Sequence, residues 1–164
     1  MNQPRNTAPA PVASSSARAD QRKGTPLKLP PKLRDELTAL ARRGYPHEVC
    51  GLLVGRETGV GTAVERITSA ANLEKDRVDD RYTLDPRDYL RADAAAQRDG
   101  LEIVGVWHTH PDHPARPSTT DLKFAWDSYT YLILSVPRKG WIEIRAWALE
   151  GDRFVERPIE EVRQ

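Results

Sequence analysis

Residues 102–121 read EIVGVWHTHPDHPARPSTTD, an apolar run that ends in closely spaced histidines and a proline-rich loop. The run is short and rich in Ile and Val, which predicts a buried strand over 102–108. His108 and His110 then project to the same side of the sheet, because side chains alternate along a strand. Two imidazoles on one side can share a single cation.

Asp121 lies eleven residues after His110, in the first turn of a helix predicted to begin at Ser118. A carboxylate at this position can supply a third ligand. Two histidines and one carboxylate leave a fourth tetrahedral position for water, which is typical of catalytic rather than structural zinc sites. Ser118 and Asp121 also fit a helix-capping pattern, and we do not expect one carboxylate to serve easily as both cap and ligand.

Helix and strand patterns alternate on both sides of this stretch. Leucines at helical spacing predict a helix over 32–43, and Asp85 followed by Pro86 predicts the start of a second helix that ends near Gly100. Further strands are predicted over 49–55, 61–70, 131–136, 141–149 and 153–158. This order predicts an α/β (α+β layered) domain, with a central, mostly mixed β-sheet flanked by helices.

Residues 1–27 contain mainly Ala, Pro and Ser and almost no large apolar side chain. Such a segment cannot bury enough surface to offset the entropy of chain ordering, so we expect a disordered N-terminal tail, followed by one domain over 28–164. The tail also lacks the continuous apolar segment of a signal peptide. The one cysteine, Cys50, excludes an intrachain disulfide and fits a reducing, cytoplasmic location.

The composition argues against two classes of partner. The chain has 25 basic and 24 acidic residues, a net charge of +1, which does not suggest a nucleic-acid-binding surface. It has no apolar run near 18 residues, so we expect no membrane span.

A proton acceptor is the remaining requirement for hydrolysis, and Glu48 is the candidate. It follows a polar turn and enters an apolar strand, where partial burial would bring its pKa near the working pH. The letters His47-Glu48 do not begin an H-E-x-x-H motif, because position 51 is Gly. His47 is more simply a surface turn residue, and Cys50 a buried small apolar residue rather than a nucleophile.

The positions just described match a known pattern. Glu48, the segment His108-Thr109-His110-Pro111, and Ser118 with Asp121 resemble the signature E…H-[ST]-H-P-x(6)-S-x-x-D of the JAMM (MPN-plus) zinc metalloproteases. The phrases HEVCGLLVGR (47–56) and RYTLDPRDY (81–89) are similar to the compact bacterial branch, which includes sulfur-carrier-processing peptidases. The resemblance runs from about residue 27 to the C-terminus.

The resemblance implies a fold similar to the cytidine-deaminase-like architecture and one zinc ion bound by His108, His110, Asp121 and a water. It implies that Glu48 is the general acid/base and that Ser118 donates to the oxyanion of the tetrahedral intermediate. The implied reaction is hydrolysis of an amide or isopeptide bond following the C-terminal Gly-Gly of a ubiquitin-like sulfur-carrier protein or its conjugate.

Other residues near the motif are candidates for contacting substrate or supporting the ligands. They are Trp107, Thr109, Pro111 and His113, and Trp107 and Trp126 are also candidates for the walls of the cleft. Two alternatives stay open: a catalytically inactive MPN-type scaffold that binds partners, and a phage-tail-type JAMM peptidase. A zinc deaminase is excluded, because its P-C-x-x-C signature needs more than one cysteine.

Overall fold

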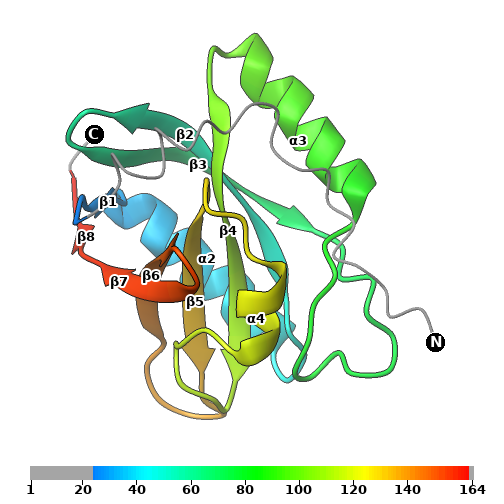
Figure 1. The fold of residues 1–164 in the computed structure, drawn as a ribbon. Helices are drawn as coiled ribbons and strands as arrows, with labels where there is room; N and C mark the ends of the chain where they lie inside the picture. The colour runs from blue at the N-terminus through cyan, green and yellow to red at the C-terminus, as the bar shows by residue number, and fades with distance from the viewer. Residues whose placement is uncertain (1–23, 163–164) are drawn as a thin grey trace.

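The computed structural model describes residues 24–162 (Figure 1). Its helices are α2 (Pro31–Gly44), α3 (Pro86–Arg98) and α4 (Thr119–Phe124). Its strands are β1 (Leu27–Lys28), β2 (Cys50–Thr58), β3 (Gly61–Ala70), β4 (Glu102–Pro111), β5 (Thr130–Val136), β6 (Glu143–Glu150), β7 (Arg153–Arg157) and β8 (Ile159–Glu160). None of the described helices has the length and apolar character needed to cross a bilayer.

The strands form one mixed sheet in the order β7-β6-β5-β4-β2-β3-β1-β8. The central strand β4 pairs antiparallel with β2 and parallel with β5. A parallel pair requires a crossover connection, and here that connection carries α4 past the carboxyl end of β4. The predicted fold class is therefore confirmed, and the crossover brings the histidine strand and the helix of Asp121 together.

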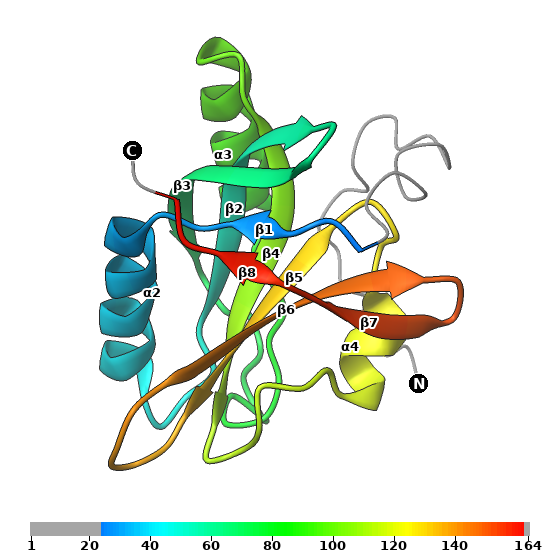
Figure 2. The ribbon, with the colours of Figure 1, turned by 90° about the vertical axis from the view of Figure 1, so that its left-hand side faces the viewer.

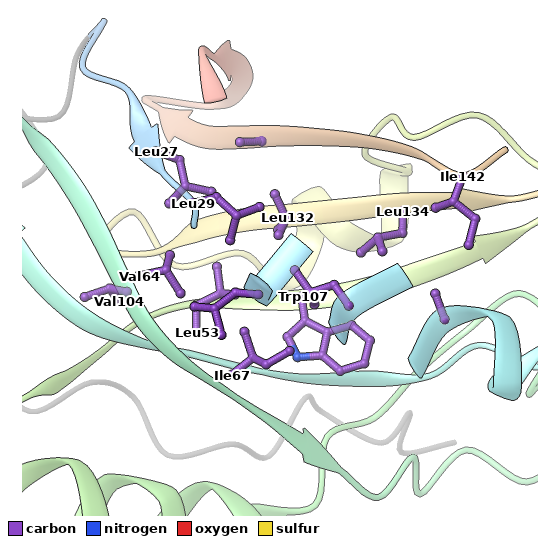
Figure 3. Packing of buried hydrophobic residues seen from close by; sticks show 14 of the residues in the cluster. Leu27, Leu29, Leu53, Val64, Ile67, Val104, Trp107, Leu132, Leu134 and Ile142 are labelled. Atoms are coloured by element: carbon purple, nitrogen blue, oxygen red, sulfur yellow. The ribbon is translucent and has the colours of Figure 1, made fainter. Parts of the chain in front are cut away.

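Helices cover both faces of the sheet. Figure 2 shows α2 on one side of the sheet and α4 on the other. The face under α2 holds the larger apolar cluster, which includes Leu33 and Leu37 of the helix. Figure 3 shows sheet residues of this cluster, among them Leu53 and Trp107. The second cluster includes Tyr89 and Ala92 of α3. Burial of these two apolar faces is the main force that fixes the strand register.

The sheet curls so that its two ends lie close to each other. Strands β7 and β8 are separated by Pro158 alone, yet they lie at opposite ends of the strand order, as Figure 2 illustrates. The buried guanidinium of Arg157 joins these parts by donating to Thr130 Oγ1 of β5, Thr62 Oγ1 of β3 and the Pro26 carbonyl. These bonds satisfy a charge that would be costly to bury without partners.

The predicted boundary of the tail is corrected by β1. Leu27 is fully buried and pairs with Thr62 of β3 and Ile159 of β8, so it belongs to the folded domain. Two-residue strands such as β1 and β8 are too short to produce a periodic pattern, which is why neither was predicted. Residues 1–23 lie outside the described residues, and their disorder stays a prediction.

Candidate active site

Strand β4 positions the two central histidines. It extends through Pro111, three residues beyond the predicted end, so that both His108 and His110 are strand residues with buried rings. Their rings point to the same side of the sheet, and the two Nε2 atoms lie 3.0 Å apart. The predicted alternation along this strand is confirmed.

Helix α4 brings Asp121 to the same place. Its carboxylate lies 3.3 Å from His108 Nε2 through Oδ1 and 3.6 Å from His110 Nε2 through Oδ2. The three residues thus form a group that could hold a metal ion. Two tetrahedral ligands with bonds of about 2.0–2.1 Å lie about 3.3 Å apart, so the spacing of these atoms fits a zinc ion.

The proton positions also fit a cation between the three side chains. His110 Nδ1 lies 3.0 Å from the Pro114 carbonyl, which can only accept a hydrogen bond. His110 therefore carries a proton on Nδ1, and in its neutral form it turns the lone pair of Nε2 toward His108 and Asp121. An outer hydrogen bond of this kind is typical of metal-binding histidines. Lone pairs that converge in a buried space repel one another unless a proton or a metal ion lies between them.

The electrostatics of the metal-free site favour the metal-binding forms of His108 and Asp121. Burial lowers the pKa of His108, which keeps the imidazole neutral. Burial opposes ionisation of Asp121, but the facing His108 and hydrogen bonds from His108, His110 and Ser118 hold its pKa below the usual range. A neutral imidazole and an ionised carboxylate are the forms that bind a metal. Burial lowers the pKa of His110, but its hydrogen bonds to Asp121 and the Pro114 carbonyl outweigh this effect and raise the pKa.

Asp121 is a helix cap as well as a ligand candidate. The Ser118 N–H and hydroxyl both donate to Asp121 Oδ2, at 2.6 Å and 2.7 Å, and the Asp121 N–H donates to Ser118 Oγ at 3.1 Å. Capping uses Oδ2 while Oδ1 faces His108, so the geometry leaves room for both roles, and the ligand role of Asp121 stays a prediction. The hydroxyl proton of Ser118 points to Asp121, not into open space.

Glu48 lies beside this group. Its side chain is buried and lines a cavity of about 200 Å³ together with His110, Ser118 and Asp121. Desolvation raises the pKa of Glu48 to about 8, while the charge of His110 opposes the shift and those of Asp121 and Asp80 add to it. A carboxyl group with a pKa near neutrality can exchange protons during a reaction.

The remaining candidates divide between the two faces of β4. Pro111 and His113 line the cavity, and His113 Nδ1 lies 3.0 Å from the Pro111 carbonyl. Trp107 and Thr109 point the other way: the Trp107 indole packs in the α2 core and donates to the Thr68 carbonyl, and Thr109 Oγ1 accepts from the Val49 N–H. The cavity lining does not include Trp107, so the prediction that Trp107 forms a wall of the cleft is wrong.

Other aromatic side chains form the wall. They are Tyr82, Phe124 and Tyr131, and the Tyr82 ring stacks on His108 with a centroid distance of 4.5 Å. Trp126 also lies outside the cavity lining and packs against the second core cluster. The segment RYTLDPRDY was a sequence signal for Tyr82, but nothing in the local spacing indicated that its ring would reach the histidines.

Two neighbours of Glu48 have no place in the site. His47 is exposed and pairs with Asp79 on the surface, at 2.6 Å. Cys50 is buried in an apolar cluster, and burial raises the pKa of its thiol to about 12, which makes it a poor nucleophile. Both residues lie where they were predicted. The catalytic and ligand roles of the residues in the cavity stay predictions.

Comparison with known proteins agrees with this geometry. Residues 30–150 match the family model described as prokaryotic homologs of the JAB domain. The desampylase of Haloferax volcanii is 35% identical over 136 residues, which cover 79% of this chain and 92% of the relative. The CysO-cysteine peptidase of Mycobacterium tuberculosis is 31% identical over 147 residues, which cover 87% and 97%. A solved structure from Desulfitobacterium hafniense is similar with a TM-score of 0.74 and 35% identity, covering 84% and 94%.

These matches extend over most of the described domain, including β2, β4 and α4, which carry the candidate site. They confirm the family resemblance predicted from Glu48, His108, His110, Ser118 and Asp121. The chain therefore belongs to the family of prokaryotic homologs of the JAB domain, a group of JAMM-like peptidases.

Proposed function

We propose that the protein is a zinc-dependent peptidase that hydrolyses the amide or isopeptide bond after the C-terminal Gly-Gly of a ubiquitin-like sulfur-carrier protein. The observation that carries this proposal is the convergence of His108 Nε2, His110 Nε2 and Asp121 at 3.0–3.6 Å beside the buried carboxyl of Glu48. Relatives named desampylase and CysO-cysteine peptidase support the substrate class.

In the proposed reaction His108, His110 and Asp121 would hold one zinc ion, which would supply a Lewis acid for the attacking water and the scissile carbonyl. Glu48 accepts a proton from the attacking water as the water oxygen forms a bond to the carbonyl carbon. Glu48 then delivers this proton to the leaving nitrogen, and the C–N bond breaks. Ser118 donates to the oxyanion, which requires its hydroxyl to turn from Asp121 Oδ2 toward the substrate. We propose that this occurs in the cytoplasm, whose reducing conditions suit the unpaired, buried Cys50.

The cavity supports an extended, slender substrate. Tyr82, Phe124 and Tyr131 line the same cavity as His110, and we infer that these rings leave room mainly for residues without side chains next to the scissile bond. The inactive-scaffold alternative is less favoured, because every proposed ligand and the proposed base are present and lie together. A scaffold has no need of a buried Glu48, whose ionisation costs desolvation energy.

A carrier ending in Gly-Gly plus one added residue tests the proposal. The zinc-loaded protein should release the added residue, detected as the corresponding mass loss from the carrier. Replacing the terminal Gly of the carrier with Val should lower kcat/KM at least tenfold, because the side chain meets the aromatic wall. Equal cleavage of unrelated peptides without Gly-Gly would mean a general peptidase, and no cleavage by the zinc-loaded protein would contradict the proposed activity.

A further inference from the structure

Glu48 is held by a loop rather than by the sheet. It lies two residues before β2, and its backbone N–H donates to the Val78 carbonyl at 2.7 Å. Its carbonyl accepts from the Asn72 side-chain amide at 3.1 Å. Both partners belong to the connecting loop, residues 71–85, which joins β3 to α3. The location of the proposed base therefore depends on a segment more than twenty residues away in sequence.

The Asn72 side chain uses its full hydrogen-bonding capacity in this loop. Its Nδ2 donates to the carbonyls of Glu48 and Arg81, at 3.1 Å and 3.0 Å. Its Oδ1 accepts from the N–H groups of Glu74 and Thr83, at 3.0 Å and 2.9 Å. An amide offers two N–H donors and two lone pairs, and all four have partners. One side chain thus joins Glu48 to both arms of the connecting loop.

These bonds also flank the aromatic residue that covers a metal ligand. Arg81 and Thr83 lie on either side of Tyr82, whose ring stacks on His108 at 4.5 Å. The amide of Asn72 therefore fixes Glu48 and Tyr82 relative to each other. A displacement of about 1 Å at a reacting group can cost on the order of 100-fold in rate.

We infer that Asn72 is a positioning residue that holds the Glu48 carboxylate and the Tyr82 ring in register with the His108–His110–Asp121 group. The donor half of the amide makes the connection to Glu48, whereas the acceptor half folds the connecting loop. Other bonds hold the ends of that loop together: Leu73 N–H to the Thr83 carbonyl at 2.8 Å, and Asp85 N–H to the Ala71 carbonyl at 3.0 Å. Loss of the donors alone should thus leave the fold intact.

The substitution Asn72→Asp separates the two halves, because a carboxylate keeps the acceptor and removes both donors. The matched control is Arg77→Ala, which removes an exposed ion pair to Asp80 within the same loop and no bond to Glu48. Amide hydrogen exchange at Glu48 should accelerate at least tenfold in Asn72→Asp and less than twofold in Arg77→Ala. Melting temperature and zinc content should stay close to wild type in both variants.

The catalytic consequence rests on the proposed function. With the Gly-Gly carrier substrate, Asn72→Asp should lower kcat at least tenfold and change KM less than twofold, while Arg77→Ala changes neither by more than twofold. Unchanged exchange at Glu48 in Asn72→Asp would overturn the inference, as would equal losses of kcat in both variants. A wild-type protein that cleaves no carrier contradicts the proposed function alone, since the exchange measurement reads the position of Glu48 without turnover.

Discussion

Ser118 and Asp121 hold each other in place: two donors of Ser118 bind Asp121 Oδ2, and the Asp121 N–H binds Ser118 Oγ. The same pair starts helix α4 and aims Asp121 Oδ1 at His108 Nε2, 3.3 Å away. The hydrogen bonds that cap the helix therefore also orient the carboxylate of Asp121, the proposed third ligand.

Replacing Ser118 with Ala should lower zinc affinity as well as turnover. The change removes a donor that orients a ligand carboxylate, and lost outer-shell partners typically cost about 10- to 100-fold in metal affinity. Loss of the cap should also cost about 1 kcal/mol of stability. Zinc titration and thermal unfolding measure the two effects. Ser118→Thr keeps the hydroxyl and serves as the control; unchanged zinc affinity in Ser118→Ala would show that the cap does not orient Asp121.

Replacing Glu48 with Gln should separate the proposed base from the ligands. Gln keeps the size and polarity of the side chain but cannot accept the proton, so zinc content should persist while kcat falls by about 10² or more. Metal analysis and carrier cleavage measured on the same sample test this. Loss of zinc from Glu48→Gln would instead make Glu48 a ligand.

The metal-free protein should become less stable as pH rises through neutrality. Burial raises the pKa of Glu48 in the folded protein to about 8 from its ordinary value of 4.5, so folding favours its protonated form. The unfolded state loses this proton near pH 4.5 and the folded state only near pH 8. The contribution of Glu48 to stability is therefore fully present below pH 4.5 and is lost as the pH rises to about 8. This loss amounts to about a few kcal/mol of unfolding free energy between pH 4.5 and pH 8, and Glu48→Gln should abolish it.

Thermal unfolding of metal-free wild type and Glu48→Gln at pH 5 and pH 8 provides the comparison. The difference between the two proteins, rather than the absolute stability, isolates Glu48 from other titrating groups. The variant should gain stability relative to wild type at pH 8. A difference that does not change with pH would mean that Glu48 ionises normally in the folded protein.

The N-terminal boundary predicts a contrast between two truncations. Deleting residues 1–23 should leave the melting temperature nearly unchanged, because their composition cannot support a core. Deleting 1–27 should destabilise the domain strongly, since it removes the buried Leu27 of β1 and the Thr25 and Pro26 acceptors of Arg157. Leu27→Ala alone should cost about 2–5 kcal/mol. Equal melting temperatures for the two truncations would contradict the role of β1.

Local patterns predicted most of the fold and the centre of the site. Alternation along a strand is enough to predict that His108 and His110 share one side of the sheet. A helix-start pattern is enough to predict that Ser118 precedes the helix and that Asp121 lies in its first turn. The same alternation places Trp107 on the opposite face, which the wall prediction overlooked. Asn72 and Tyr82 could not be found in this way, because their contacts with Glu48 and His108 depend on the path of the connecting loop.

Zinc titration of metal-free protein, wild type against His108→Ala, tests whether His108, His110 and Asp121 hold one metal ion. We expect one tight site per chain in wild type and loss of that site in His108→Ala, because His108 Nε2 lies within 3.3 Å of both other proposed ligand atoms. Unfolding of each protein without metal controls for misfolding. One equally tight zinc bound per chain in a folded His108→Ala variant would contradict the account.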